Sequence, residues 1–153
     1  MQRANGEVEM CRMVSIVAAA ALVALCGVCN CVAADKTPEQ FVQEAKAAIR
    51  EVSVADVKNM LDAKENIIVL DVRDRHEFDE GNIPGSINLS RGMLEFKAAL
   101  MIPDKNARIV VLCGLDLRGP LATRTLNELG YKNAVNMIGG LKAWKEAGYP
   151  IGK

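Results

Sequence analysis

Cys113 and Arg118 are the residues of this chain whose types and spacing point most directly to chemistry. Four residues separate them. A cysteine acts as a nucleophile through its thiolate, and a nearby arginine supplies positive potential that favours an anion. The backbone N–H groups of a short glycine-containing loop can curl around the same anion. The spacing therefore predicts a reactive thiol whose substrate is bound by Arg118 and by the loop residues Gly114, Leu115, Asp116, Leu117 and Gly119.

The segments on either side of this loop are expected to hold it in place. Residues 109–112 form an unbroken apolar run rich in β-branched residues, which is typical of a strand buried on both faces of a parallel sheet. A helix is predicted from Pro120 to Leu129, with Gly130 at its C-cap. Ligands of such sheets bind at the carboxyl ends of the strands, where a helix N-terminus adds positive potential. The cysteine would stand at that edge.

The remaining apolar runs and capping patterns alternate between strands and helices. Strands are predicted over residues 67–72, 87–89 and 134–137, and helices over residues 38–49, 53–61, 91–100 and 141–147. Thr37 and Gln40 form a capping-box pattern around Pro38, at the start of the first of these helices. The alternation predicts an α/β fold, in which a parallel sheet carries helices on both faces.

Four motifs in register make this chain resemble the rhodanese family of sulfurtransferases. They extend from about Glu51 to the C-terminus and comprise Leu70-Asp71-Val72-Arg73, Ile83-Pro84-Gly85-Ser86-Ile87-Asn88, the loop from Cys113 to Arg118, and Gly139-Gly140-Leu141-Lys142-Ala143-Trp144. The resemblance implies a rhodanese-like parallel sheet in a single domain. It also implies that Cys113 is the nucleophile and that Asp71 and Arg73 support the floor of the site.

The same resemblance implies a reaction and its partners. A sulfane sulfur would pass from a small donor, thiosulfate or a persulfide, to Cys113, and then from the Cys113 persulfide to a thiol, to cyanide or to an acceptor protein. Related phosphatases and arsenate reductases carry one more residue between cysteine and arginine. Two alternatives stay open: a non-catalytic rhodanese-like module that binds a partner or only carries sulfur, and, with least support, a phosphatase-type enzyme. No metal or organic cofactor is implied.

Three positions depart from the family pattern. Rhodaneses usually carry histidine where Asn82 stands, an uncharged residue where Asp116 stands, and a small hydroxyl residue where Gly119 stands. The change at Asn82 is expected to be neutral. An Asp116 carboxylate about 6 Å from a thiolate, in a partly exposed pocket, would repel an anionic donor by on the order of 1 kcal/mol. We therefore expect poor use of thiosulfate and a preference for less charged donors.

The N-terminal segment has the plan of a secretory leader. Residues 13–29 carry no charge, follow Arg12 and lead into small residues that end at Ala34. This pattern predicts a signal peptide over residues 1–34 that is cleaved before Asp35. The expected location of the mature protein is periplasmic or secreted.

Two other fates of the leader stay open. An uncleaved anchor, with the domain facing outward, and a lipid-modified Cys26 would each place the protein at a membrane. In every case, residues 35–50 are expected to form a helical extension and residues 51–153 the rhodanese-like domain.

Composition and cysteine usage narrow the class of protein further. The chain carries 19 basic and 19 acidic residues without a basic stripe, which argues against a nucleic-acid-binding protein. Cys113 would be the only thiol left after cleavage, so no intramolecular disulfide could form, and a lone thiol in an exported protein points to reactivity. The leader cysteines lack the histidines or second cysteine pair of a zinc site. His76, the only histidine, is interpreted as a solvated residue in a charged turn.

Overall fold

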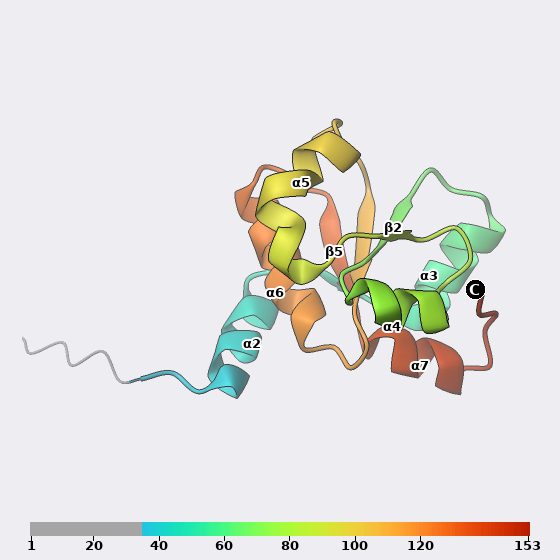
Figure 1. Cartoon of the computed structure of the whole chain (residues 1–153), viewed down its shortest axis with the longest axis horizontal. Coiled ribbons are helices and arrows are strands. Elements are labelled where there is room, and N and C mark those ends of the chain that lie inside the picture. The colour runs from blue at the N-terminus through green and yellow to red at the C-terminus, as the bar shows by residue number, and fades with distance from the viewer. Residues whose placement is uncertain (1–34) are drawn as a thin grey trace, which may run out of the picture. The chain divides into compact units, whose positions relative to one another are not determined.

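Five parallel strands form the sheet at the centre of the protein (Figure 1). The computed structural model describes residues 35–153. The strand order is β1-β5-β4-β2-β3, and every neighbouring pair is parallel. The strands are β1 (Glu51–Val52), β2 (Ile68–Asp71), β3 (Ile87–Asn88), β4 (Ile109–Leu112) and β5 (Ala134–Met137). Strand β4, which precedes the predicted reactive loop, therefore lies in the middle of the sheet.

Helices connect the strands and cover the sheet. They are α2 (Pro38–Ala47), α3 (Val54–Asp62), α4 (Arg75–Glu80), α5 (Leu94–Met101), α6 (Arg118–Glu128) and α7 (Gly140–Glu146), and a short 3-10 turn, η1 (Arg91–Met93), precedes α5. Strands β4 and β5 have the bounds predicted from the sequence. The first helix begins at Pro38 as predicted, and its capping box is formed: the Thr37 N–H donates to Gln40 Oε1 at 2.9 Å.

The core is divided into two layers, one on each face of the sheet. Alternate side chains of β4 point to opposite faces. Ile109 and Val111 lie in a buried cluster with apolar side chains of α5 and α6, whereas Val110 and Leu112 cluster with those of α3 and α7. The predicted α/β fold, a parallel sheet with helices on both faces, is thus confirmed. Helix α2 packs against α6 rather than against the sheet (Figure 1).

The register of β2 and β4 brings two predicted site segments to one edge of the sheet. Leu112 pairs with Asp71, and these are the last residues of their strands. The Val72 N–H then donates to the Leu112 carbonyl at 2.9 Å. The Asp71 motif and Cys113 consequently emerge next to each other at the carboxyl edge, where parallel α/β sheets bind their ligands.

Three features of the chain differ from the sequence-based expectation. Strand Glu51–Val52 was not predicted, because two residues are too short to show a period. Helix α4 was not predicted either, because none of its residues is buried and it has no apolar stripe. Its one local signal is the spacing of Asp74 and Glu77, whose carboxylate accepts the Asp74 N–H at 3.0 Å. Helix α6 begins at Arg118, because Pro120 in the first turn needs no N–H partner.

The start of α7 lies unusually close to the end of β4. The Leu141 N–H donates to the Cys113 carbonyl at 2.7 Å, and the Lys142 N–H donates to the Gly114 carbonyl at 3.1 Å. Gly140 has φ of 61°, and a Cβ at this position would overlap the Cys113 carbonyl oxygen. A glycine is therefore required at Gly140 for two reasons, its backbone conformation and the space available.

We predict that Gly140→Ala lowers the free energy of unfolding by about 2 kcal/mol or more, since the added Cβ meets both strain and a carbonyl. Gly92→Ala is the matched control, because a Cβ at Gly92 meets no atom within 4 Å. Urea unfolding of the two variants measures the difference. A Gly140→Ala protein as stable as the Gly92→Ala protein would contradict this account of the α7 contact.

Candidate active site

Cys113 is placed directly after β4 and is almost fully buried. Its side chain is 1% exposed and belongs to the apolar cluster beneath α5 and α6, together with Ala122. Within residues 35–153 it forms no disulfide. A thiolate in such surroundings is stable only where hydrogen-bond donors or positive charges face it. The loop that follows supplies both.

The backbone amides of this loop are available to an anion. The N–H groups of residues 114–117 donate no hydrogen bond to any residue that the structure describes. The side chains of Leu115 and Leu117 are largely exposed, at 64% and 56%. Consecutive unpartnered amides in a short turn form an anion-binding nest. The structure therefore brings together the thiol and the loop that the sequence predicted, with Gly119 buried in the first turn of α6.

The environment of Asp116 corrects one expectation. Its carboxylate accepts a hydrogen bond from Lys46 Nζ at 2.5 Å and another from Asn136 Nδ2 at 2.7 Å, and the residue is only 9% exposed. The expected partial exposure of this carboxylate is therefore wrong, and the expected repulsion of an anionic donor stays a prediction, now for a carboxylate that is paired. The physical reason is that α2, which the family resemblance did not cover, supplies a compensating cation. Asp116 has φ of 62°, a conformation that aspartate tolerates better than most residues.

Arg118, the first residue of α6, lies at the rim of the loop. Its two terminal nitrogens bind the Glu77 carboxylate at 2.7 and 2.8 Å, and Asp74 Oδ2 lies 3.5 Å from Nη1. A Cβ built on Gly114 would be 3.9 Å from Arg118 Nη2, so the guanidinium borders the loop backbone. Two of the five N–H donors are used by Glu77. The side chain is 36% exposed, and its other donors can meet a substrate.

The ion pair at this rim determines the charge state of Glu77. Hydrogen bonding from Arg118 lowers the pKa of Glu77 from 4.5 to about 2, against the opposing effect of burial. The same interaction raises the pKa of Arg118, to which the negative charge of a Cys113 thiolate also contributes. Arg118 is therefore within electrostatic reach of Cys113. At neutral pH both partners are charged, and the pair has no net charge.

Asp71 and Arg73 form the buried floor of the site. The Asp71 carboxylate accepts the Arg73 backbone N–H at 3.0 Å and Arg73 Nη2 at 2.7 Å, and the residues are 0% and 5% exposed. The guanidinium also donates to the carbonyls of Glu77 at 2.9 Å and Gly81 at 2.8 Å. It thus ties the end of β2 to the middle of α4 and to Gly81, the residue that follows this helix. This geometry places Glu77 where it can bind Arg118.

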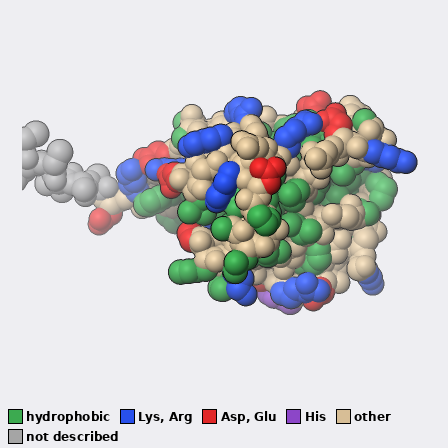
Figure 2. Space-filling model, turned by 90° about the horizontal axis from the view of Figure 1, so that it is seen from above, with side chains coloured by type: hydrophobic (Ala, Val, Ile, Leu, Met, Phe, Trp, Pro, Cys, Tyr) green, Lys and Arg blue, Asp and Glu red, His purple; other side chains and the backbone are tan. Residues whose placement is uncertain are grey.

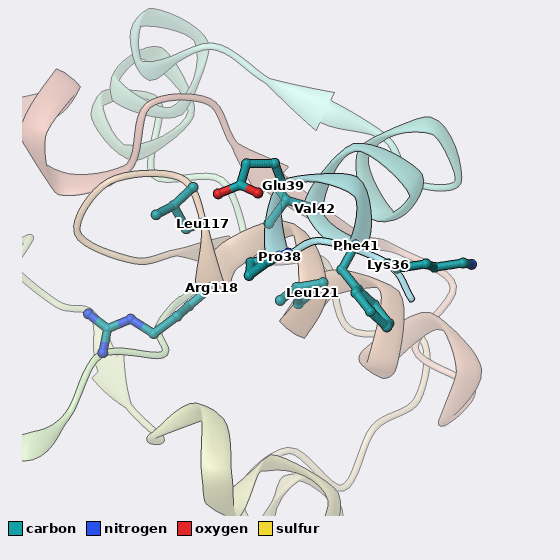
Figure 3. A pocket seen from close by; sticks show the side chains of 8 residues that line it. All are labelled: Lys36, Pro38, Glu39, Phe41, Val42, Leu117, Arg118 and Leu121. Carbon is teal, nitrogen blue, oxygen red and sulfur yellow. The ribbon is translucent and has the colours of Figure 1, made fainter. Parts of the chain in front are cut away.

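Two hollows border the reactive loop. A groove of about 470 Å³ lies between α2 and the start of α6, and Leu117 and Arg118 reach it from the loop side (Figure 3). Phe41 and Leu121 contribute apolar side chains from the two helices (Figure 3). A second hollow, of about 330 Å³, is lined by Gly114 together with residues of α4 and α7. Residues of the loop line both hollows, whereas the buried Cys113 lines neither.

The other sequence-based expectations concern surface charge, His76 and the leader. On the face seen in Figure 2, basic, acidic and apolar side chains are interspersed without a continuous basic stripe. His76 is exposed on α4. The predicted leader, with residues 13–29 and Cys26, lies outside the described residues. Within residues 35–153, no helix combines the length and apolar character needed to span a bilayer.

Comparison with known sequences gives the family. The profile of the Rhodanese-like domain matches residues 53–147, more than half of the chain, so this chain belongs to the rhodanese-like family. Thiosulfate sulfurtransferase GlpE of Pseudoalteromonas translucida is 30% identical over 65% of this chain and 92% of its own length. A Bacillus subtilis protein named "Putative sulfur carrier protein YrkF" is also 30% identical, over 66% of this chain. The chain spans only 54% of that protein's length.

Comparison with solved structures gives the same fold. A protein of unknown function from Rhodopseudomonas palustris, named as a possible tyrosine phosphatase, superimposes with a TM-score of 0.71 and 30% sequence identity. The likeness covers 76% of this chain and 95% of that protein. The family therefore includes relatives with sulfur-transfer, sulfur-carrier and phosphatase names on similar sequences.

The structure adds three residues to the site that the sequence did not single out as functional. One of them is Glu77, whose partner Arg118 is 41 residues away in the sequence. Lys46 and Asn136 both reach Asp116 from other elements. The Asp74 and Glu77 spacing could have located α4, but no local pattern marks Lys46 or Asn136 as neighbours of the loop. Only the packing of α2 and β5 around it brings them there.

We predict that the ion pair of Glu77 stabilises the fold in a pH-dependent way. Because its pKa is depressed in the folded state, the stabilisation is present above pH 4.5 and is lost as the pH falls towards about 2. At neutral pH, Glu77→Gln should lower the free energy of unfolding by about 1 to 2 kcal/mol, a value reduced for solvent screening. Urea unfolding of both proteins across this pH range measures the effect.

The control for this prediction is Glu128→Gln, which removes a more exposed pair with Arg124 at 3.0 Å. It should change stability by only a few tenths of a kcal/mol. A Glu77→Gln deficit that stays constant down to pH 2 would show that the ionised carboxylate is not its source.

Proposed function

We propose that this protein is a sulfurtransferase that carries a sulfane sulfur as a persulfide on Cys113. The observation that carries this proposal is the set of unpartnered amides of residues 114–117 directly after the buried thiol. These amides suit a terminal sulfur that bears negative charge. Membership of the rhodanese-like family and similarity to a thiosulfate sulfurtransferase support the same reaction class.

The proposed reaction consists of two displacements at sulfur. The Cys113 thiolate attacks the sulfane sulfur of the donor, an S–S bond forms to Sγ, and the donor's own bond to that sulfur breaks. With thiosulfate as donor, the electron pair leaves on sulfite. A thiolate or cyanide acceptor then attacks the outer sulfur of the persulfide, and Cys113 departs as the thiolate. No net electron transfer to or from the protein is required.

The loop and its rim have separate proposed roles in this reaction. The amides of residues 114–117 hold the negative charge of the thiolate and of the persulfide. The unused donors of Arg118 orient the anionic end of the donor, since guanidinium geometry suits oxyanions. Asp71 and Arg73 touch no reacting atom in this account, and they hold α4 in place. The four-residue spacing between Cys113 and Arg118 favours sulfur transfer over phosphate chemistry.

A sulfur-carrier role is the second candidate, and the similarity to YrkF is the observation that favours it. An enzyme and a carrier share the first displacement and differ in the second. A carrier would be loaded by the donor in the same way but would pass its sulfur to a small acceptor no faster than a low-molecular-weight persulfide does. The single-turnover rate of the loaded protein with cyanide, compared with that of a small-molecule persulfide, distinguishes the enzyme from the carrier.

We predict that thiosulfate or a polysulfide adds one sulfur to the Cys113 peptide of the full chain and that cyanide removes it. Peptide mass spectrometry locates the sulfur, which matters because the chain has four other cysteines. Cys113→Ser should abolish the adduct and reduce thiocyanate formation by about a thousandfold or more, because a hydroxyl cannot replace the thiolate nucleophile.

The controls for this experiment separate chemistry from folding and from other reactions. Because the Cys113 side chain is buried among apolar groups, a serine hydroxyl at this position should lower the free energy of unfolding by about 1 to 2 kcal/mol, and urea unfolding should show that the variant still folds cooperatively. If Cys113→Ser still produced thiocyanate at the original rate, the assignment of the nucleophile would be wrong. Hydrolysis of an aryl phosphate without sulfur transfer would instead support the phosphatase alternative.

We also propose that the protein is exported and that its leader is removed. The charge-free segment 13–29 and the small residues before Asp35 support this proposal. We predict that the protein purified from its native host begins at or near Asp35 by N-terminal sequencing. A product that retains residues 13–29, or one acylated on Cys26, would place the domain at a membrane instead.

A further inference from the structure

Three features that lie outside the family pattern meet at one point of the structure. Helix α2 precedes the matched range of residues 53–147, and Asp116 and Gly119 are the two departures within the reactive loop segment. Lys46, on α2, binds Asp116 Oδ2 at 2.5 Å. These partners are 70 residues apart in the sequence, so only the tertiary fold brings them into contact.

Asn136 of β5 completes this cluster. Its Nδ2 group donates to Asp116 Oδ1 at 2.7 Å and to Glu51 Oε1 at 2.8 Å, so both of its hydrogens are used. The residue is fully buried, and a Cβ built on Gly119 would come closer to its Oδ1 than van der Waals contact allows. A side chain at Gly119 would therefore displace Asn136. Asp116 and Gly119 are thus two parts of one arrangement.

The low solvent exposure of this cluster raises the free-energy cost of breaking the pair of Lys46 and Asp116. The Asp116 side chain is 10% exposed and that of Lys46 is 26% exposed. Removing one partner of a buried pair leaves an uncompensated charge, which costs more than the pair itself contributes. Glu51 lies 3.9 Å from Lys46 Nζ, so the ammonium faces two carboxylates. Without it, the loop would carry negative charge beside its own anion site.

Lys46 is also within electrostatic reach of the reactive thiol. Its pKa is raised, first by the hydrogen bond to Asp116 and also by the charges of Asp116, Glu51 and a Cys113 thiolate. Two paired cations therefore act on the loop. Arg118 is paired with Glu77, and Lys46 is paired with Asp116.

We propose that Lys46 is a positioning residue of the reactive loop: by pairing with Asp116 it keeps that carboxylate from opposing an anion at Cys113. The sulfur-transfer unit then includes α2 and β1 as well as the matched family range. This inference rests on the proposed function for its biological meaning. The effect of Lys46 on the electrostatic field at Cys113 can be measured without any sulfur donor.

The test compares two alkylating reagents of similar size and different charge. Iodoacetate is an anion and iodoacetamide is neutral. Both alkylate Sγ with loss of iodide, the first adding a carboxymethyl group and the second a carbamoylmethyl group. Their rate constants at the Cys113 peptide of the full chain, followed by mass spectrometry, give a ratio that reports the local field. A purely structural defect changes the two rates together, whereas a field changes their ratio.

We predict that Lys46→Met lowers the iodoacetate-to-iodoacetamide ratio about fivefold at low salt, because the Asp116 carboxylate is then unpaired. The effect should shrink as salt is added. Lys46→Arg should restore most of the ratio, since the positive charge returns. Asp116→Asn should raise the ratio or leave it unchanged, because Lys46 then has one carboxylate fewer to neutralise.

Two further variants make the outcome decisive. The double variant Lys46→Met with Asp116→Asn should return the ratio close to the original, and asparagine tolerates the positive φ of this position. Lys58→Met is the matched control: the Lys58 side chain is also 26% exposed and pairs with Asp62 at 2.5 Å, but it lies on α3. Its ratio should not change.

Several results would overturn the proposal. An unchanged ratio in Lys46→Met would do so, as would a lowered ratio that the double variant fails to restore, because the defect would then not depend on the carboxylate. A Cys113 that reacts with neither reagent would exclude an anion-accessible loop. Failure of the proposed function is distinguishable, since a protein that gains no sulfur from any donor can still show the predicted order of ratios.

Discussion

The end of strand β4 leaves backbone groups that no neighbouring strand can pair, and the site is built around this constraint. The Leu112 carbonyl still finds a partner in the Val72 N–H. Beyond it, the carbonyls of Cys113 and Gly114 accept hydrogen bonds from the first turn of α7. The amides of residues 114–117 have no such partners among the described residues. Buried polar groups are normally satisfied, so this one-sided pairing leaves N–H donors for an anion.

The charged side chains around the loop are paired rather than free. Arg118 binds Glu77 of α4, and Asp116 binds Lys46 of α2. The pair of Asp71 and Arg73 is buried at the end of β2. Each such pair fixes the orientation and position of its two side chains and adds no net charge to the site. The attraction for an anion therefore comes mainly from backbone dipoles and from the donors that these pairs leave unused. The geometry of the loop depends on the packing of all three elements.

The family assignment does not by itself decide which reaction the protein carries out. Relatives of this chain carry names for transfer, carriage and phosphate chemistry, because one fold supports several functions. The difference between enzyme and carrier lies in how an acceptor reaches the loop. The exposed Leu115 and Leu117 side chains and the groove beside α2 form the surface that an acceptor would meet. That surface is partly made by a helix outside the matched family range.

Local patterns were sufficient to predict most of the fold. The apolar run of β4, the capping box at Thr37 and the alternation of strands and helices each depend on neighbouring residues, and the structure confirms them. The Cys113 loop was likewise visible as a motif. Helix α4 was missed because it buries no residue, and β1 because it is only two residues long.

The sequence by itself determined the order of the elements and the chemistry of the loop, since those follow from residue types within a few positions of one another. Only the tertiary structure decided the electrostatics. The sequence shows an acidic residue at Asp116 but not the Lys46 and Asn136 that bind it, and it shows Arg118 but not its pairing with Glu77. A charge acts through space and through the dielectric around it, so its effect is set by partners that the fold brings from distant parts of the chain.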